Sequence, residues 1–213
     1  DLFLNPIKNR HNLDIVTHAL VERVVIEDGK TTGIDISVKD QARRYMLKPG
    51  GEVILSAGAI GSPQILQLSG VGPGTLLHGL DIPVIKDMPG VGANLFDHLQ
   101  IRTVYEVNVP TLNAEINNFF RRMLIGMQYV LKRTGPMSMG ASQVAIFAKS
   151  REGLETPDIQ YHFQPLSAAK PGIEMHPFPG VTLSVCQLRP ESKGRIEITS
   201  ADPKAYPAIH PNY

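Results

Sequence analysis

The segment EVILSAGAIGSPQILQLSGVG, residues 52–72, combines a short apolar run, a glycine-containing turn and a second apolar stretch. The run EVILSAG has the length and composition of a strand covered on both faces. Ser62 and Pro63 suit the N-cap and the first position of a helix, which would run through QILQLSG and end at Gly70. The segment therefore predicts a buried strand, a turn and a helix with unpaired N–H groups at its N-terminus.

Such a turn can approach a ligand closely, because glycine has no side chain and the helix dipole favours a polar or negative group. A pyrophosphate or a ribose oxygen would satisfy both features. Taken alone, however, the turn is explained better by a plain connection between a strand and a helix.

The residues before this segment predict a β-meander. LDIVTH and VERVVIE carry β-branched residues at short spacing, at residues 13–18 and 21–27. Asp28 to Lys30 suit a tight hairpin turn, and TTGIDISV, residues 31–38, supplies the returning strand.

The residues after it predict an antiparallel sheet with one long helix near residues 113–133. Apolar residues recur along this helix at three and four positions, which predicts a face packed in the core. They are Ile116, Phe119, Phe120, Met123, Leu124, Met127, Val130 and Leu131. The expected strands are IRTVYEV, QVAIFAK, DIQYHFQ, VTLSVCQLR and RIEITS, at residues 101–107, 143–149, 158–164, 181–189 and 195–200. PESKG between the last two is short enough for a hairpin.

These elements predict an α+β protein with a first part over residues 1–97 and a second over 98–213. The net charge is +1 and no long charged block occurs, so nucleic acid is not expected as a partner. The single cysteine, Cys186, excludes a disulfide within the chain. No stretch is long enough to span a membrane, and we expect a cytoplasmic protein. The histidines have no metal-ligand spacing, so no metal is assigned.

One stretch also carries a family resemblance. GAIGSPQILQLSGVG closely resembles the second signature of the glucose-methanol-choline (GMC) oxidoreductases. Its fixed positions are matched by Gly58, Ser62, Pro63, Ser69, Gly70 and Gly72. Segments on both sides, among them LDIPVIKDMPGVGANLFDH and LRPESKGRIEITSADP, resemble the same family in the same order, so the resemblance covers nearly the whole chain.

The resemblance implies FAD bound in a split flavin domain, oxidation of an alcohol by hydride transfer to the flavin, and a separate antiparallel substrate domain. Residues 1–97 would then be part of the FAD-binding domain, and 98–213 the substrate-binding domain. The family's GxGxxG fingerprint does not occur here, and its catalytic histidine is expected beyond Tyr213. We therefore expect an internal fragment that contains no catalytic residue, binds no FAD by itself and is inactive alone.

The resemblance also implies cofactor contacts. Val21 resembles the valine whose backbone meets the adenine, and Ala57, Gly58 and Ala59 resemble the turn along the ADP half of FAD. Asn94 is a polar member of a flavin-domain stretch, together with Asp97 and His98. For His98 a structural hydrogen bond is favoured over catalysis, because proton transfer needs a positioned partner.

Two alternatives stay open from the sequence. A nicotinamide-dependent dehydrogenase would use AGAIG as its pyrophosphate turn and Asp81 as the acidic residue about 20 positions on, but proline and glycine break the intervening helix. A structural or substrate-binding module without cofactor is favoured for the chain by itself. The substrate could be choline, an aliphatic or aromatic alcohol, or a sugar, and the oligomeric state is not indicated.

Overall fold

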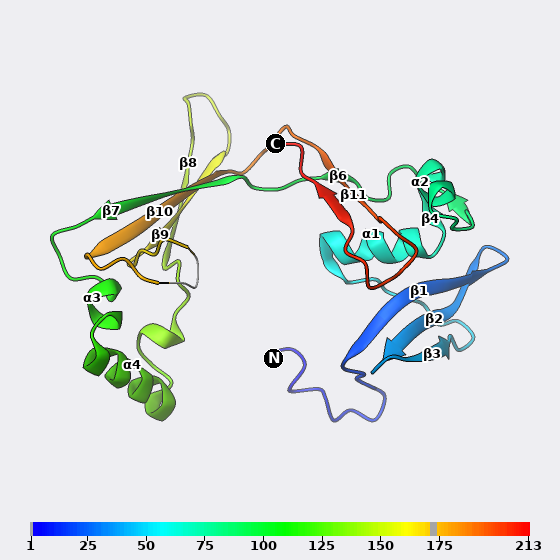
Figure 1. Cartoon of the computed structure of the whole chain (residues 1–213), viewed down its shortest axis with the longest axis horizontal. Helices are drawn as coiled ribbons and strands as arrows, with labels where there is room; N and C mark the ends of the chain where they lie inside the picture. Colours follow the sequence, from blue (N-terminus) through cyan, green and yellow to red (C-terminus); the bar gives the residue numbers. More distant parts are fainter. Residues whose placement is uncertain (1, 171–173) are drawn as a thin grey trace. The chain divides into compact units, whose positions relative to one another are not determined.

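The computed structural model describes residues 2–170 and 174–213, which form two compact units (Figure 1). The first unit contains the residues up to Phe96 together with Ser192–Tyr213, and the second contains Asp97–Glu191. Every sheet but one is antiparallel, and helices are few, so the predicted α+β class is confirmed.

The first unit contains the meander. Strands β1 (Ala19–Glu27), β2 (Lys30–Val38) and β3 (Gln41–Met46) pair in that order. The tight hairpin turn predicted over Asp28 to Lys30 is confirmed, with Asp28 and Gly29 as its two central residues at φ of +51° and +73° and with Lys30 already in β2. The prediction of a strand at LDIVTH is wrong, since no strand forms before Ala19. The third strand is β3, whose residues are all exposed, so it forms by pairing with β2 rather than by burial.

Helix α1 (Gly58–Leu68) follows the meander and begins earlier than predicted, with Ala57 rather than Ser62 at its N-cap and Pro63 inside it. Gly70 follows the C-cap residue Ser69 with φ of +80°. The strand predicted at EVILSAG is absent, and Ile54 is 81% exposed. A strand needs neighbours for its backbone hydrogen bonds, and the described residues provide none there.

Short elements complete the first unit. Helix α2 (Gly74–Gly79) stands between β4 (Val71–Gly72) and β5 (Lys86–Asp87), which pair in parallel. Strands β6 (Ala93–Leu95), β11 (Gly194–Glu197) and β12 (Ala208–His210) form a sheet in the order β12-β11-β6. One buried apolar cluster of this unit consists of Leu77, Ile82 and Ile198.

The predicted hairpin between VTLSVCQLR and RIEITS is therefore wrong. The first forms β10 (Gly180–Gln187) in the second unit, whereas β11 pairs with β6 and β12 in the first. The cause is burial, because Ile196 and Ile198 are 1% and 4% exposed inside the first unit. The second compact unit accordingly ends at Glu191. Residues 192–213 were predicted to belong to the second part, but they lie in the first unit.

The second unit is built on one antiparallel sheet. Its order is β7-β10-β9-β8, with β7 at Gln100–Glu106, β9 at Ile159–Gln164 and β8 at Val144–Ala148. The helix predicted over residues 113–133 is two helices, α3 (Leu112–Ile116) and α4 (Phe119–Lys132), followed by the short 3-10 helix η1 (Pro136–Ser138). Asn118 separates them because its side chain caps α4, accepting a hydrogen bond from the Arg121 N–H at 3.1 Å.

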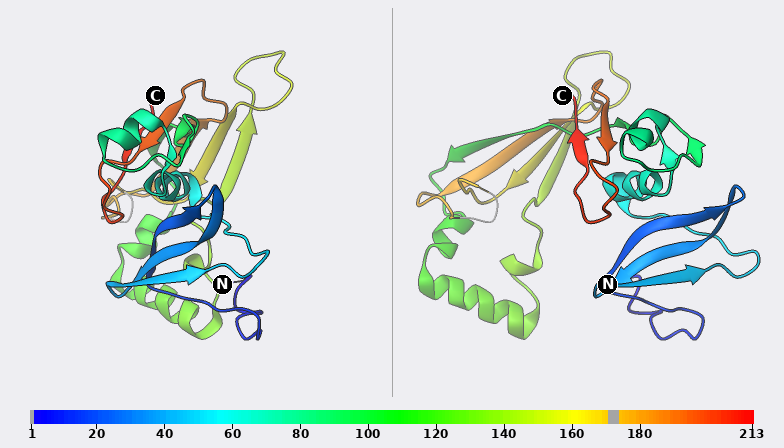
Figure 2. Two further views of the ribbon diagram at one scale, coloured as in Figure 1. Left: turned by 90° about the vertical axis from the view of Figure 1, so that its right-hand side faces the viewer. Right: turned by 45° about the vertical axis from the view of Figure 1, so that its right-hand side comes forward.

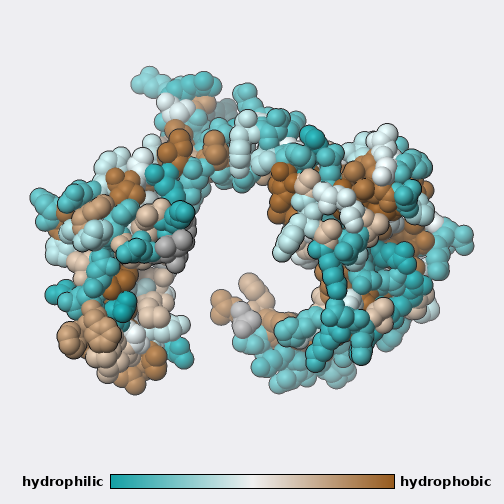
Figure 3. Space-filling model, viewed as in Figure 1, coloured by the Kyte–Doolittle hydropathy of each residue, from teal (hydrophilic) through white to brown (hydrophobic). Residues whose placement is uncertain are grey.

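The predicted core-facing stripe of this helix is exposed. No residue of α4 is buried among the described residues, and Phe120 and Leu131 are 70% and 73% exposed. Apolar side chains are visible on the surface in Figure 3. The prediction of a packed face is therefore wrong for this chain. Among residues 2–170 and 174–213, no helix combines the length and the apolar character that a bilayer crossing needs.

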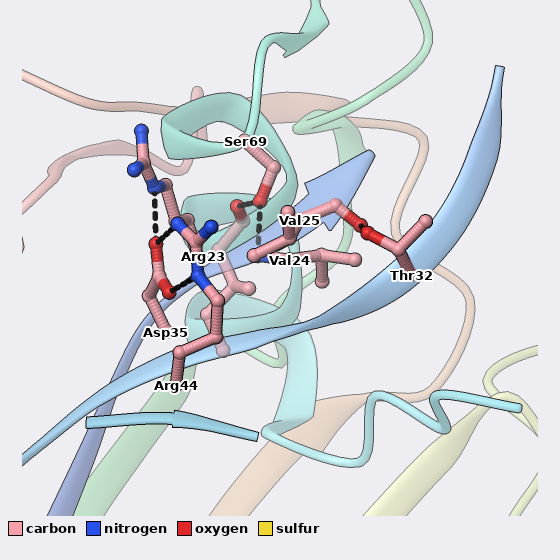
Figure 4. Close-up of polar contacts among 8 residues, drawn as sticks. Arg23, Val24, Val25, Thr32, Asp35, Arg44 and Ser69 are labelled. Atoms are coloured by element: carbon pink, nitrogen blue, oxygen red, sulfur yellow. Dashed lines mark hydrogen bonds and ion pairs between the residues drawn. The ribbon is translucent and has the colours of Figure 1, made fainter. Parts of the chain in front are cut away.

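A cluster of charged side chains lies on the meander (Figure 4). Asp35 of β2 accepts hydrogen bonds from Arg23 Nε at 2.9 Å and from Arg44 Nε at 2.6 Å. The hydrogen bond from Arg44 is the main reason that the pKa of Asp35 falls to about 2, while burial opposes the shift. This carboxylate therefore links all three strands of the sheet.

We predict that this link makes stability depend on pH. A lowered folded-state pKa gives stabilisation that is present above the ordinary value and is lost as pH falls from about 4 towards 2. Asp35→Asn should cost roughly 1 kcal/mol at pH 6 and about half as much at pH 3. Urea unfolding at both pH values measures it. In the double variant Arg23→Gln/Arg44→Gln, the free energy of unfolding should likewise change less with pH than in the unchanged protein. An unchanged pH dependence of the free energy of unfolding in either variant would contradict the assignment.

We also predict that Gly70 is required for packing after α1. An alanine Cβ would need the left-handed backbone at φ +80° and would collide with the Pro83 carbonyl oxygen. Gly70→Ala should lower the free energy of unfolding by about 2–4 kcal/mol. Gly29→Ala is the control, since Gly29 has φ of +73° but nothing within 4 Å of its Cβ position. Equal losses in the two variants would show that only backbone strain matters.

Candidate functional site

The turn at the start of α1 is open. Gly58 has φ of +77°, and no atom lies within 4 Å of the position that its Cβ would occupy. Ala57, Gly58 and Ala59 are all exposed. The first N–H groups of a helix have no intrahelical acceptor, and the N-cap residue Ala57 provides no side-chain acceptor for them. The turn thus offers small side chains and a free helix N-terminus.

Ser62 has a different role from the predicted N-cap. Its hydroxyl oxygen accepts a hydrogen bond from the Ala57 N–H at 3.1 Å, so the residue folds the turn back on the first helical residues. A residue of the helix itself therefore fixes the conformation of the turn, and the space beside Gly58 is left open.

The other end of α1 is tied to the meander, and Figure 2 shows both from two further directions. The Ser69 hydroxyl accepts from the Val24 N–H at 2.8 Å and donates to the Ile65 carbonyl oxygen at 2.5 Å (Figure 4). Ser69 is 4% exposed. This serine of the family signature therefore joins the helix to β1.

Gln67 positions the middle of the same helix and was missed by the sequence analysis. Its side chain is fully buried. The amide nitrogen donates to the carbonyl oxygens of Ile196 and Val91 at 3.0 and 3.2 Å, and the amide oxygen accepts from the Ile198 N–H at 2.9 Å. The only signal in the sequence is a glutamine within the otherwise apolar run ILQLSGVG, which does not reveal its partners.

The remaining predicted contact residues lie on other elements of the first unit. Val21 is half-buried in β1 and pairs with Ile36 directly before a register shift. Asn94 is exposed in β6 with φ of +58°. Among the described residues no hydrogen bond joins Val21, Asn94 or the α1 turn to one another. Asp97 and His98 are exposed and begin the second unit.

The α1 turn lies on the exposed surface of the first unit. Two hollows of about 240 and 320 Å³ lie beside the C-terminal half of α1, and Leu68, Ile82 and Pro83 line both. Neither Val21 nor the α1 turn lines them. The turn fits one edge of a nucleotide, because it is unobstructed and carries helix N–H groups. It does not by itself enclose an FAD molecule.

The nicotinamide alternative is not favoured by this geometry. That fold needs a parallel βαβ unit around the glycine turn. The only parallel pair among the described strands is β4 with β5, two residues each, and residues 47–57, which lead into the turn of α1, form no strand. Asp81 lies after α2 and is exposed.

Comparison with known proteins agrees with this picture. Residues 1–100 match the family model described as GMC oxidoreductase. The chain is 38% identical over 214 residues to the oxygen-dependent choline dehydrogenase of Pseudomonas syringae pv. syringae (strain B728a), covering 99% of this chain and 37% of that protein. The corresponding protein of Burkholderia ambifaria (strain MC40-6) is 38% identical over 215 residues with the same coverage. The chain thus spans a little over a third of the length of these relatives.

Solved structures show the same fold. The crystal structure of formate oxidase matches with a TM-score of 0.85 at 24% identity, over 97% of this chain and 41% of that one. Pyridoxine 4-oxidase from Mesorbium loti matches with a TM-score of 0.77 at 20% identity, over 98% and 36%. The family model, the relatives and the fold agree with the signature from Gly58 to Gly72, and the chain belongs to the GMC oxidoreductase family.

Proposed function

We propose that this chain works within a polypeptide of its relatives' length, called the parent protein below. We further propose that the parent is an FAD-dependent oxidoreductase acting on the CH–OH group of an alcohol. The observation that carries the proposal is 38% identity to choline dehydrogenases across 99% of the chain. In that reaction FAD, when bound, accepts the hydride from the alcohol carbon.

The role of the first unit would be to contact the cofactor. The α1 turn suits the ADP half of FAD, because Gly58 adds no bulk and the helix N-terminus favours negative charge. We assign the adenine contact to the Val21 backbone and a polar contact to Asn94. Asn94 is exposed, so its amide is accessible to a ligand. We assign no catalytic residue to this chain.

The role of the second unit, Asp97–Glu191, would be to bind the substrate. Its sheet and helices belong to a different compact unit from the α1 turn. The identity of the relatives suggests an alcohol, and a cytoplasmic location stays a prediction from the sequence.

We predict that Gly58 is needed for flavin binding in the parent protein. Gly58→Val places a branched side chain on the open side of the turn and should weaken FAD affinity at least tenfold, or about 1.4 kcal/mol. Titration of the apoprotein with FAD, followed by flavin fluorescence, measures it. Gly50→Val is the matched control, since Gly50 has φ of +78° and nothing within 4 Å of its Cβ position. If both variants bind FAD like the parent, the turn does not contact the cofactor.

We predict that the chain alone does not hold FAD. The pyrophosphate needs a glycine turn with a helix N-terminus and a ribose partner, and the α1 turn supplies only part of these contacts. The same titration on the isolated chain should show no saturation in the micromolar range. A parent protein without flavin absorbance would refute the proposed function, whereas micromolar binding by the isolated chain would refute only the position of the cofactor site.

A further inference from the structure

A cavity of about 350 Å³ lies in the second unit between α3, α4 and the segment that leads into β8. Its described walls are largely apolar. The larger apolar side chains that line it are Leu112, Ile116, Ile125, Met137, Met139 and Leu166, and Pro136 and Ala141 are also in the lining. At ~30 Å³ for each water-sized group, the cavity accommodates about ten non-hydrogen atoms. This is the lower end of the range for small-molecule sites.

The cavity has few polar groups, and they differ in kind. The Gln143 backbone N–H donates to the Phe163 carbonyl oxygen at 3.0 Å, which fixes the residue beside β8. Its side-chain amide makes no hydrogen bond within the described residues, so it can bind a ligand hydroxyl. Arg122 of α4 adds a positive charge, and no carboxylate of the described chain lies within ion-pair distance of it.

This lining does not suit a quaternary ammonium ion. Such cations are held by aromatic faces or by carboxylates, and none of the described residues that line the cavity has either group. Glu115 lines a neighbouring hollow but is not part of the cavity's own wall. The two hollows share Leu112, Pro136, Met139 and Gln143. The guanidinium of Arg122, which lies over the Phe119 ring at 5.9 Å but has no carboxylate within ion-pair distance among the described residues, would repel a cation further.

A sugar fits poorly as well. A polyol needs a hydrogen-bond partner for each buried hydroxyl, and Gln143 and Arg122 are the only described side chains in the wall that offer one. An alcohol with one hydroxyl and an apolar body is matched on both counts. Its body would contact the leucine, isoleucine and methionine side chains, and its hydroxyl would bind the Gln143 amide.

We propose that this cavity binds an uncharged alcohol with an apolar body and discriminates against choline. The claim that this alcohol is the substrate rests on the proposed function. The claim that the cavity binds it does not. Met137 and Met139 are 57% and 54% exposed, so the cavity opens to solvent beside them. Thioether side chains adapt easily to ligands of different shape.

The test uses the methionine methyl groups as reporters. The chain has 7 methionines and no tryptophan, so a ¹³C-methyl-methionine spectrum is simple and intrinsic tryptophan fluorescence is not available. Benzyl alcohol should shift the signals of Met137 and Met139 saturably and leave Met46 and Met88 of the first unit unchanged. Choline chloride at tenfold higher concentration should shift none of them. Shifts of Met137 and Met139 by choline at equal concentration, or no shift by benzyl alcohol, would overturn the proposal.

Two pairs of variants sharpen the test. Ala141→Phe fills the cavity and should abolish the benzyl alcohol shifts, whereas Ala145→Phe, on β8 outside the lining, should keep them. Arg122→Glu should raise the affinity for choline at least tenfold. Arg121→Glu makes the same charge change on α4 outside the lining and should not. An unchanged Met175 signal in the absence of ligand shows that the second unit of each variant is folded, because Met175 belongs to that unit and does not line the cavity. Equal responses within either pair would count against the site.

The same variants in the parent protein separate this proposal from the proposed function. If the parent oxidises no alcohol while benzyl alcohol still shifts Met137 and Met139, the function is refuted and the binding site stands. If the parent oxidises choline with a lower KM than benzyl alcohol, and Arg122→Glu leaves both KM values unchanged, the cavity is not the substrate site.

Discussion

The buried side chain of Gln67 determines how the first unit holds together. It joins α1 to the Val91 carbonyl and to β11, a strand that follows it by 129 residues in sequence at the Ile196 contact. Truncating it would leave several buried backbone groups without partners, at about 1–3 kcal/mol each. Gly92 fits this constraint, because a Cβ at that position would lie 2.6 Å from the Gln67 amide nitrogen. The segment after Glu191 therefore belongs with α1 and not with the sheet that precedes it.

Helix α1 is anchored on one side and free on the other, which separates its structural residues from its functional ones. Ser69 and Gln67 hold its C-terminal half to β1 and β11, while the N-cap residue Ala57 provides no side-chain cap for the first turn. The family signature thus contains two kinds of residue. Ser69 and Gly70 serve packing, and Gly58 leaves space where we place the cofactor. Stability measurements and flavin titrations should consequently respond to different members of the same short segment.

Local patterns in the sequence predicted local structure well. The turn at Asp28–Gly29 and the strand at VTLSVCQLR follow from turn chemistry and alternation, which depend on neighbouring residues only. Two of the failures involve distant partners. PESKG suits a hairpin, but burial of Ile196 takes the next strand elsewhere, and EVILSAG lacks the neighbours that its composition implies. Asn118 divides the predicted long helix because its side chain caps α4. The prediction missed this break because an amphipathic pattern does not distinguish a polar N-cap from a polar position within a helix.

The family fixes the kind of reaction more firmly than the substrate. An identity of 38% preserves the fold and the signature turn, yet a few side chains in one cavity can change which alcohol is accepted. Arg122 and Gln143 illustrate this, since neither belongs to the signature and neither was singled out by the sequence. A site that binds a cation needs an aromatic ring or a carboxylate in its wall. Replacing that ring or carboxylate by an arginine would make the site disfavour a cationic ligand without altering the fold. We therefore propose that specificity depends on the second unit and that the cofactor contact depends on the first.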